Sequence, residues 1–335
     1  MKIVSIGGYG HSVCAFDEII QMHEAKLVAY APAFDGEDLS IITSHKIYND
    51  NILYYDNYKE MLDNEKPDVV IISTRLDKIA EVSIDAANKG CHLICEKPLA
   101  LSQNDLTNLY EAVKKNNVKL MAMLSMRAEQ PFIAAREIYQ SGKIGEAVLI
   151  NSRKSYKWAV RPEWFGDKSK YGSTIGWVGI HALDFINFIT GLEFVSVAAM
   201  KSNFSHPERK DCDDNVGMVL ELSNGGHATA SVDFFRPKTA ETHGDDWIRI
   251  VGTKGVLEAS TANNNCVVIT DEEKETIIPE NLENKIFKNF LNSLIRKTNP
   301  DFSEYIPFML TNACLSAVDS AVYKKDIKID NSKWK

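Results

Sequence analysis

Short, continuously apolar segments alternate with amphipathic segments of helical period over the first third of the chain. The apolar segments predict strands at 2–6, 26–31, 68–74, 92–98 and 118–124. The amphipathic segments predict helices at 11–22, 78–90 and 102–117, with Ser102 as an N-cap and Gly90 as a C-terminal stop. Strands that are apolar throughout and are separated by helices are typical of a parallel, doubly wound α/β sheet.

The pattern changes after about residue 125, where polar and apolar residues begin to alternate. Alternation and turn residues predict strands at 147–158, 195–204, 216–224, 227–235, 247–253 and 255–260. Helical patterns occur at 129–142, 175–190, 281–296 and 303–324. We therefore expect two domains, residues 1–124 with the parallel sheet and residues 125–335 as an α+β domain with an open, mostly antiparallel sheet.

Length, charge and cysteine use agree with a two-domain protein of the cytoplasm. The chain has 335 residues, of which 44% are hydrophobic, and a formal net charge of -8. It contains no basic block suited to nucleic acid or an anionic membrane, no signal peptide and no apolar run of about 18 residues. The six cysteines are scattered without zinc-ligand spacing, so we expect no metal site and a reducing cytoplasm.

A glycine-rich turn, "SIGGYG" at residues 5–10, follows the first predicted strand. A dinucleotide-binding fingerprint has the form G-x-G-x-x-G in this place, and Ser5 stands at its first glycine. Gly7 would let the backbone approach a pyrophosphate, and Gly10 would permit close packing of helix on strand. The alternative is an ordinary tight turn, but the alternating strands and helices favour an N-terminal Rossmann domain.

The preferred dinucleotide is less well determined by the sequence. An acid that binds the ribose of NAD is usually found at the end of the second strand. Residues 29–34 contain no acid before Asp35, and no arginine suited to a 2'-phosphate. The missing cationic site favours NAD, and NADP is not excluded.

The fourth predicted strand ends in "LICEKPLAL", residues 93–101, with Glu96, Lys97 and Pro98 in succession. In a doubly wound sheet, the carboxyl ends of strands face the ligand crevice. This places an acid and an amine where a cofactor would react. The alternative is a surface lysine, with Glu96 beside the start of a helix.

These residues and several later ones give the chain a resemblance to a known family. "CEKPLAL" after "DVVIIST", together with "GKIGE" (142–146), "GIHALDF" (179–185) and "IRIVGTKGVLE" (248–258), resembles the glucose-fructose oxidoreductase, inositol dehydrogenase and MocA family over nearly the whole chain. The resemblance implies that Lys97 lies beside the nicotinamide and hydrogen-bonds the reacting oxygen of the substrate. It implies a set of cofactor-binding residues: Ile6, Gly7, Gly8, Tyr9, Gly10, Ser73, Thr74, Glu96 and Lys97.

The segment 173–188, which contains most of the predicted helix at 175–190, departs from the family pattern. His181 and Asp184 match the family, but the acid expected four residues before the histidine is Trp177. His181 can still act as the general base, whereas an indole only donates a hydrogen bond and cannot relay a proton. Trp177 would either stack on a sugar-like ring or mark a changed reaction, and core packing is the structural alternative. Gly176 and Gly179 suggest that a ligand or backbone approaches this helix closely.

Further residues are candidates for the substrate site, together with Trp177 and Asp184. These are Arg127, Tyr156, Arg161, Trp164 and His243. Arg127 matches a family arginine, but Ala128 replaces the usual aromatic that follows it. A role in solvated loops is an equal alternative for each of these residues.

The predicted function is NAD(P)-dependent hydride transfer between nicotinamide and a hydroxyl or keto group of a sugar, cyclitol or derivative. The open sheet face predicts a homodimer or homotetramer, because such a face has to be covered. One alternative is a redox-neutral lyase or glycoside-cleaving enzyme with tightly bound NAD. Another is a non-catalytic, dinucleotide-binding regulatory protein, although such a protein would need neither Lys97 nor His181.

Overall fold

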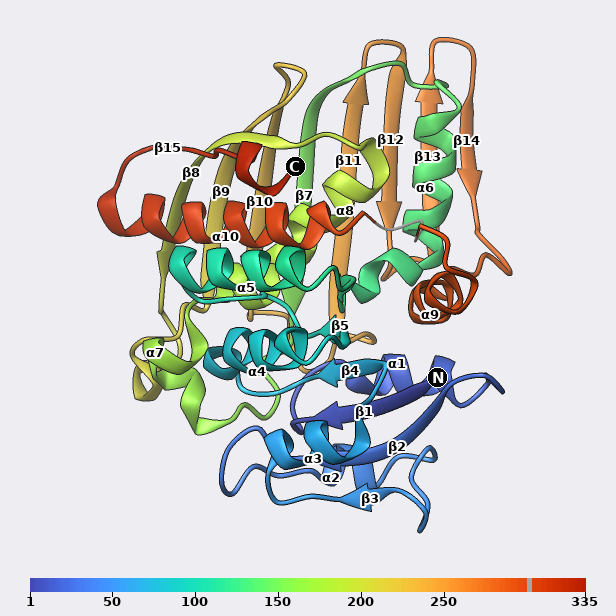
Figure 1. Ribbon diagram of the computed structural model, residues 1–335. Coiled ribbons are helices and arrows are strands. Elements are labelled where there is room, and N and C mark those ends of the chain that lie inside the picture. Colours follow the sequence, from blue (N-terminus) through green and yellow to red (C-terminus); the bar gives the residue numbers. More distant parts are fainter. Residues whose placement is uncertain (300–302) are drawn as a thin grey trace. The chain divides into compact units, whose positions relative to one another are not determined.

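The computed structural model describes residues 1–299 and 303–335, and its contacts group these into two compact units (Figure 1). The first unit comprises residues 1–125, 285–311 and Trp334, and the second comprises residues 126–284, 312–333 and Lys335. The sequence pattern assigns all of 125–335 to one domain, so the return of 285–311 to the first unit is a difference. Its reason is helix α9 (Ile286–Arg296), which buries Phe287, Phe290 and Leu291 in the core of the first unit.

The first unit contains a six-stranded parallel sheet, and the apolar segments predict five of its six strands. Its strands are β1 (Lys2–Ile6), β2 (Lys26–Ala31), β3 (Leu53–Tyr54), β4 (Val69–Ile72), β5 (His92–Cys95) and β6 (Leu120–Ala122). They are arranged in the order β3-β2-β1-β4-β5-β6. The order reverses between β1 and β4, which is the switch point at which doubly wound sheets bind ligands. The prediction of a Rossmann fold is confirmed.

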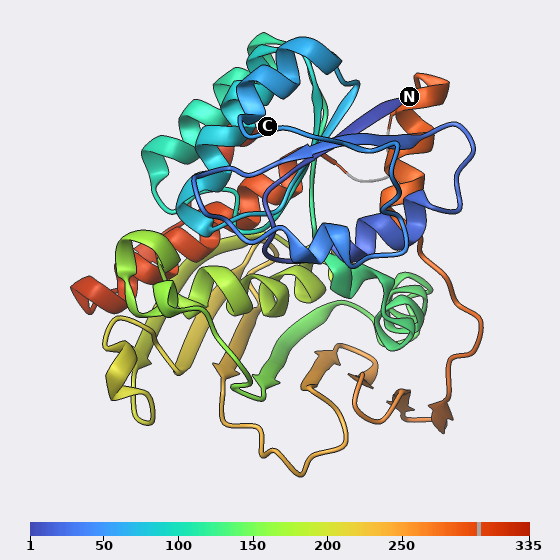
Figure 2. The same cartoon turned by 90° about the horizontal axis from the view of Figure 1, so that it is seen from below.

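Helices cover both faces of this sheet. They are α1 (Ser12–Ile19), α2 (Ser40–Thr43), α3 (Tyr58–Glu65), α4 (Leu76–Asn88), α5 (Gln103–Lys115) and α9. Alternate strand residues such as Ile3 and Ile71 pack with α1 and α9, whereas Cys95 bonds to Ser83 of α4 on the opposite face. Figure 2 shows α4 and α5 on one side of the strands and α1 and α9 on the other.

The second unit is built on a nine-stranded sheet. Its strands are β7 (Ala147–Tyr156), β8 (Phe194–Ser202), β9 (Asn215–Leu222), β10 (His227–Asp233), β11 (Gly244–Gly252), β12 (Gly255–Ser260), β13 (Asn265–Thr270), β14 (Lys274–Ile277) and β15 (Ile327–Lys328). Their order is β14-β13-β12-β11-β7-β10-β9-β8-β15. Within the described strands, β10 and β7 run parallel and the other neighbours run antiparallel. The predicted open, mostly antiparallel sheet is confirmed.

Helices α6 (Gln130–Gln140) and α8 (Ile180–Thr190) lie on one face of this sheet (Figure 1). The remaining helices are α7 (Lys168–Tyr171), α10 (Tyr305–Tyr323), and short 3-10 turns at 125–128, 163–166, 207–209 and 332–334. A π-helical segment, Ile175–Gly179, leads directly into α8. Such segments are rare and are frequent at functional sites, so the start of α8 is a candidate for chemistry. In the part of the chain that the structure describes, no helix is long and apolar enough to span a bilayer.

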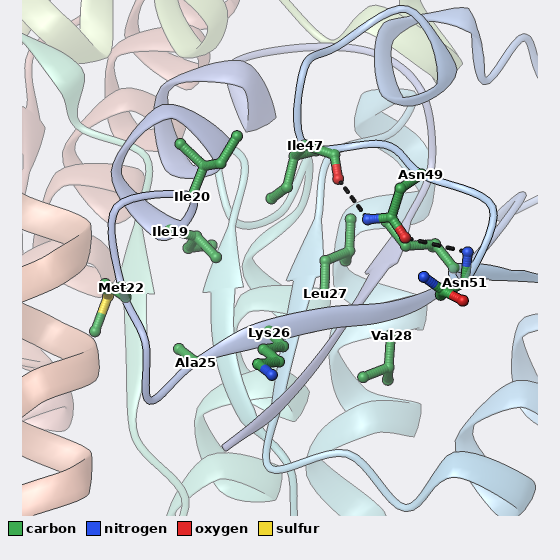
Figure 3. A pocket seen from close by; sticks show the side chains of 11 residues that line it. Ile19, Ile20, Met22, Ala25, Lys26, Leu27, Val28, Ile47, Asn49 and Asn51 are labelled. Atoms are coloured by element: carbon green, nitrogen blue, oxygen red, sulfur yellow. Dashed lines mark hydrogen bonds between the residues drawn. The ribbon is translucent and has the colours of Figure 1, made fainter.

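A pocket of about 420 Å³ lies on the first unit, away from the residues singled out by the sequence (Figure 3). Side chains from the end of α1, such as Ile19 and Ile20, face those of Ile47 and Asn49 across it. Residues 26–28, the amino-terminal half of β2, form its floor. Because ligands of doubly wound sheets bind at the carboxyl ends of the strands, this pocket is not the expected nucleotide site.

Candidate functional site

The glycine-rich turn packs tightly against the end of β4. Gly7 adopts φ +92° and Gly10 adopts φ +124°, a region that favours glycine. A Cβ on Gly7 would lie 2.5 Å from the Thr74 Cβ and 2.6 Å from the Ser73 carbonyl oxygen. Tyr9 N–H donates to the Ser73 carbonyl and the Ser73 hydroxyl donates to the Tyr9 carbonyl, each at 2.9 Å. The structure therefore brings Ser73 and Thr74 into contact with the turn.

The buried carboxylate of Glu96 links the glycine-rich turn to the residue that follows it after β5. Its carboxylate accepts from the backbone N–H of His11 at 2.5 Å, from His11 Nδ1 at 2.9 Å and from the backbone N–H of Lys97 at 2.9 Å. A Cβ on Gly10 would overlap this carboxylate, whose carbon would lie 2.8 Å away. Burial raises the pKa of Glu96, but His11 and Lys97 oppose this and hold the pKa below its usual value.

Lys97 lies one residue beyond Glu96 and is 1% exposed, so it is not the surface lysine of the alternative interpretation. Its Nζ is 4.0 Å from Glu96 Oε1, and the Lys97–Pro98 peptide is cis. Glu96 and Lys97 thus follow the carboxyl end of β5 in the same unit as the glycine turn.

Glu37 is a residue of this region that sequence reasoning missed. Its carboxylate accepts from Gly8 N–H at 3.2 Å, from Ala33 N–H at 2.7 Å and from the Thr74 hydroxyl at 2.5 Å. Burial raises the pKa of Glu37, although these hydrogen bonds oppose it. The signal was the acidic stretch "DGED" at 35–38, which lies in a loop beyond the strand end where an acid was sought.

The first unit has the features that a dinucleotide requires. The turn lies at the switch point of the sheet, has no room for side chains at Gly7 and Gly10, and opens α1. Arg75, which follows Thr74, bonds to Asp77 at 2.5 and 2.9 Å and stacks on the ring of Phe34 at 4.3 Å. Its charge is therefore already balanced by an acid. Ile6 ends β1 immediately before the turn.

In the second unit, α8 carries His181 and Asp184 one helical turn apart, and both are buried. Asp184 Oδ1 accepts from Arg127 Nε at 2.8 Å and from Arg127 Nη2 at 2.5 Å. Burial raises the pKa of Asp184, and the Arg127 guanidinium opposes this. Two of the predicted substrate residues therefore form a buried ion pair with each other.

Trp177, at the position of the missing acid, belongs to the π-helical segment and packs with aromatic side chains. Its ring meets that of Phe165 edge-on, with centroids 6.4 Å apart. Trp164 contacts Phe165 at 4.8 Å, and the Arg161 guanidinium lies 5.7 Å from the same ring. Phe165 thus joins three of the predicted substrate residues.

The packing of neighbouring protein side chains does not explain Gly179 in this segment. A Cβ on Gly179 would meet Met218 and Val232 at 3.5 and 3.6 Å, which are ordinary contact distances. No close approach of a neighbouring element to Gly179 therefore requires glycine there.

Tyr156 and His243 are also brought together, with ring centroids 5.1 Å apart. Below them lies an ion pair that sequence reasoning missed, between Lys154 of β7 and Asp246 of β11, at 2.8 Å. Lys154 is 0% exposed, and its ammonium lies 4.6 Å from the Tyr156 ring. Lys154 shares the helix-covered face of the sheet with Ile150 and Ser152, so the available signal was a lysine at an inward-facing position.

The described residues contain no group of three or more histidine, cysteine, aspartate or glutamate side chains placed to hold a metal ion. The predicted site residues instead form two groups. Those at the glycine turn, β4 and β5 belong to the first unit, and those at β7, β11 and α8 belong to the second.

Comparison with known proteins identifies the family of both units. Residues 40–124 match a model described as an oxidoreductase family with an NAD-binding Rossmann fold, and residues 132–258 match the GFO/IDH/MocA C-terminal domain. A solved structure of a putative oxidoreductase from Thermotoga maritima is 31% identical and superposes with a TM-score of 0.93, covering 98% of this chain and 100% of that one.

Two curated relatives illustrate the range of the family. Levoglucosan dehydrogenase of Pseudarthrobacter phenanthrenivorans is 29% identical over 60% of this chain and 57% of its own length. The 2,7-anhydro-N-acetylneuraminate hydratase of Escherichia coli is 26% identical over 76% of this chain and 66% of its own length. The chain thus spans somewhat less than two thirds of the length of either relative. With both domain models matched and a relative superposed along its whole length, the chain belongs to the Gfo/Idh/MocA oxidoreductase family.

Proposed function

We propose that the protein is an NAD-dependent oxidoreductase that acts on a CH–OH group of a sugar, cyclitol or derivative. The observation that carries the proposal is Lys97, a buried lysine at the carboxyl end of β5, in the unit whose glycine turn lies at the sheet's switch point. The name of the levoglucosan dehydrogenase relative supports the substrate class. The buried His181 of α8 supplies the base that such a reaction requires.

In this proposal, bound NAD supplies the hydride acceptor. The turn residues 6–10, with Ser73 and Thr74, hold the dinucleotide. The Lys97 ammonium hydrogen-bonds the reacting oxygen and stabilises negative charge that develops on it. His181 takes the hydroxyl proton, and Trp177 forms an apolar wall for the sugar ring because an indole cannot relay that proton.

We further propose that Glu37 makes the enzyme prefer NAD to NADP. A half-buried carboxylate on Gly8 N–H disfavours an additional phosphate near the turn, and Arg75 is already paired with Asp77. Glu37→Gln should lower the ratio of NAD affinity to NADP affinity by about tenfold or more. Fluorescence titration with NADH and NADPH measures this ratio. The exposed Asp35→Asn is the matched control. An unchanged ratio in Glu37→Gln would contradict this role.

We also propose that the protein forms a homodimer or homotetramer through the open face of the nine-stranded sheet. This face carries a largely apolar hollow of about 1000 Å³, lined by strands β7 to β10 and the end of α10. Met200 and Val219 expose 81% and 53% of their surface there. Val219→Glu should shift the mass measured by light scattering toward the monomer, and a wild-type monomer would refute the proposal.

The test of the proposed activity is NAD(P)H formation across a panel of sugars, inositols and sugar acids. Removal of a positioned acid or base typically lowers the rate about 10²- to 10⁴-fold, so Lys97→Met and His181→Asn should each lose most of the activity. The exposed residues Lys115→Met and His227→Asn are the controls. Turnover that survives in both active-site variants would refute the assigned roles.

Trp177 in place of an acid favours a second candidate, a redox-neutral reaction in which the hydride is returned to the substrate. The hydratase relative supports this possibility by its name. Consumption of a substrate without net NADH, still dependent on Lys97, would establish the second candidate. Dinucleotide binding with no turnover of any compound would instead favour a non-catalytic regulatory protein.

A further inference from the structure

One loop of the second unit gathers positive charge that no nearby acid balances. Lys157 Nζ donates to the Ala240 carbonyl, and Arg161 Nη2 donates to the Lys157 carbonyl at 3.3 Å. Arg209, from a distant part of the sequence, donates to the Pro162 carbonyl at 2.5 Å and to the Arg161 carbonyl at 2.9 Å. Within the described part of the chain, none of the three cations has a carboxylate within ion-pair distance. Their positive charges therefore add.

Three of the buried or half-buried acids around this loop are already paired with other cations. These pairs are Asp246 with Lys154, Asp213 with Lys201, and Asp245 with Arg153 and Arg236. The buried Asp214 and the half-buried Asp233 instead accept from backbone N–H and hydroxyl groups, so they offset only part of the charge. The remaining acids close in sequence, Glu163, Glu208 and Asp211, are exposed to solvent, where water screens their charges. The loop consequently keeps a net positive charge.

The positive charges of Lys157 and Arg161 both lie near the ring of His243, which packs on Tyr156. Lys157 N–H donates to the His243 carbonyl at 3.0 Å, and the His243 ring packs on Tyr156. Burial, followed by the charges of Arg161 and Lys157, lowers the pKa of His243. The two cations therefore act on the same imidazole.

The guanidinium of Arg161 is held by aromatic rings in an orientation that suits binding of an anion. Its guanidinium lies 4.9 Å from the ring of Phe234 and 5.7 Å from that of Phe165. Its Nε is buried without a hydrogen-bond partner among the described residues. A buried guanidinium N–H with no acceptor is costly, and a planar guanidinium fixed by aromatic rings binds an oxyanion at little entropic cost.

We propose that Lys157, Arg161 and His243 form an oxyanion subsite for a sugar substrate that carries a carboxylate or phosphate group. Arg209 acts as a positioning residue that fixes the loop by donating to the carbonyls of Arg161 and Pro162. The inference rests on the proposed function for the sugar, and it narrows the substrate class from neutral polyols to anionic sugars. It needs no residue of the first unit, so it is testable by binding alone.

The test compares binding of D-glucuronate, D-gluconate and glucose 6-phosphate with that of D-glucose and myo-inositol, by calorimetry on the full chain. Loss of one charge-assisted, bidentate contact weakens binding on the order of tenfold to a hundredfold. Arg161→Gln should weaken binding of the anionic sugars by that factor and leave the neutral ones unchanged. The exposed Lys210→Gln, next to Arg209 in sequence, is the control and should behave as wild type. Equal binding of anionic and neutral sugars would overturn the proposal.

An NMR titration of His243 separates this inference from the proposed function. Inorganic phosphate or D-gluconate should raise the pKa of His243 in wild type and much less in Arg161→Gln, because a bound anion stabilises the imidazolium. If this shift occurs but no compound reduces NAD, the proposed activity fails and the subsite stands. If neutral polyols are oxidised and no anion shifts His243, the activity stands and the subsite is refuted. Preference for glucose 6-phosphate over both sugar acids would identify the anion as a phosphate.

Discussion

Replacement of Glu96 tests how the glycine turn is held, because its buried carboxylate accepts from the backbone N–H groups of both His11 and Lys97. Glu96→Ala leaves two N–H donors without an acceptor, and each costs about 1–3 kcal/mol. The free energy of unfolding should therefore fall by about 2–6 kcal/mol. Glu96→Gln keeps one acceptor oxygen but removes the charge that meets His11, and should cost about 1.5–3 kcal/mol.

The assay is urea unfolding of both variants at pH 7, with exposed Glu111→Gln as the matched control. The pH dependence gives a second readout. The pKa of Glu96 is lowered below 4.5 in the folded protein, so its stabilising contribution is present above that value. It is lost as the pH falls through the lower folded-state pKa, and wild type and Glu96→Gln should then converge. A Glu96→Gln protein as stable as wild type at pH 7 would refute the claim that the Glu96 carboxylate stabilises the turn.

Two further substitutions test other parts of the structure by the same unfolding assay. Asp246→Asn should lower the free energy of unfolding by about 3–5 kcal/mol, because it leaves the fully buried charge of Lys154 unpaired. Joint replacement of both residues by apolar ones should recover most of that stability. An additive double variant would contradict the pairing. Gly10→Ala should cost at least about 1–3 kcal/mol from its positive φ alone and weaken NADH binding, whereas Gly217→Ala, where a Cβ meets no atom within 4 Å, should stay near wild type. Equal effects of the two alanines would contradict the packing of the turn on Glu96.

Much of the first unit could be predicted from sequence because its signals are local. Continuous apolar strands between helices fix a parallel sheet, and Ser102 caps α5 through the N–H of Asp105, as its position predicts. The short strand β3 and helix α3 were missed, because two residues of strand and eight of helix carry little periodicity. Glu37 was missed because a loop, not a strand end, carries it to Gly8.

The second unit shows where sequence patterns lose information. Alternation predicts the sheet but not which strands are neighbours, so the pairing of Lys154 with Asp246 required the register of β7 against β11. Arg209 reaches the carbonyls of Arg161 and Pro162 from 48 and 47 residues away, which no local pattern indicates. The individual candidates around α8 could be predicted from local patterns, while their charge balance depends on long-range contacts.

The central claim is that this chain moves hydride from a sugar carbon to NAD with the help of Lys97 and His181. The most direct measurement uses a substrate identified in the panel, deuterated at the reacting carbon, and mass spectrometry of the NADH released. The account predicts deuterium in the NADH formed by wild type and almost none with Lys97→Met. Consumption of the substrate with deuterium retained in the product, and no labelled NADH, would contradict it.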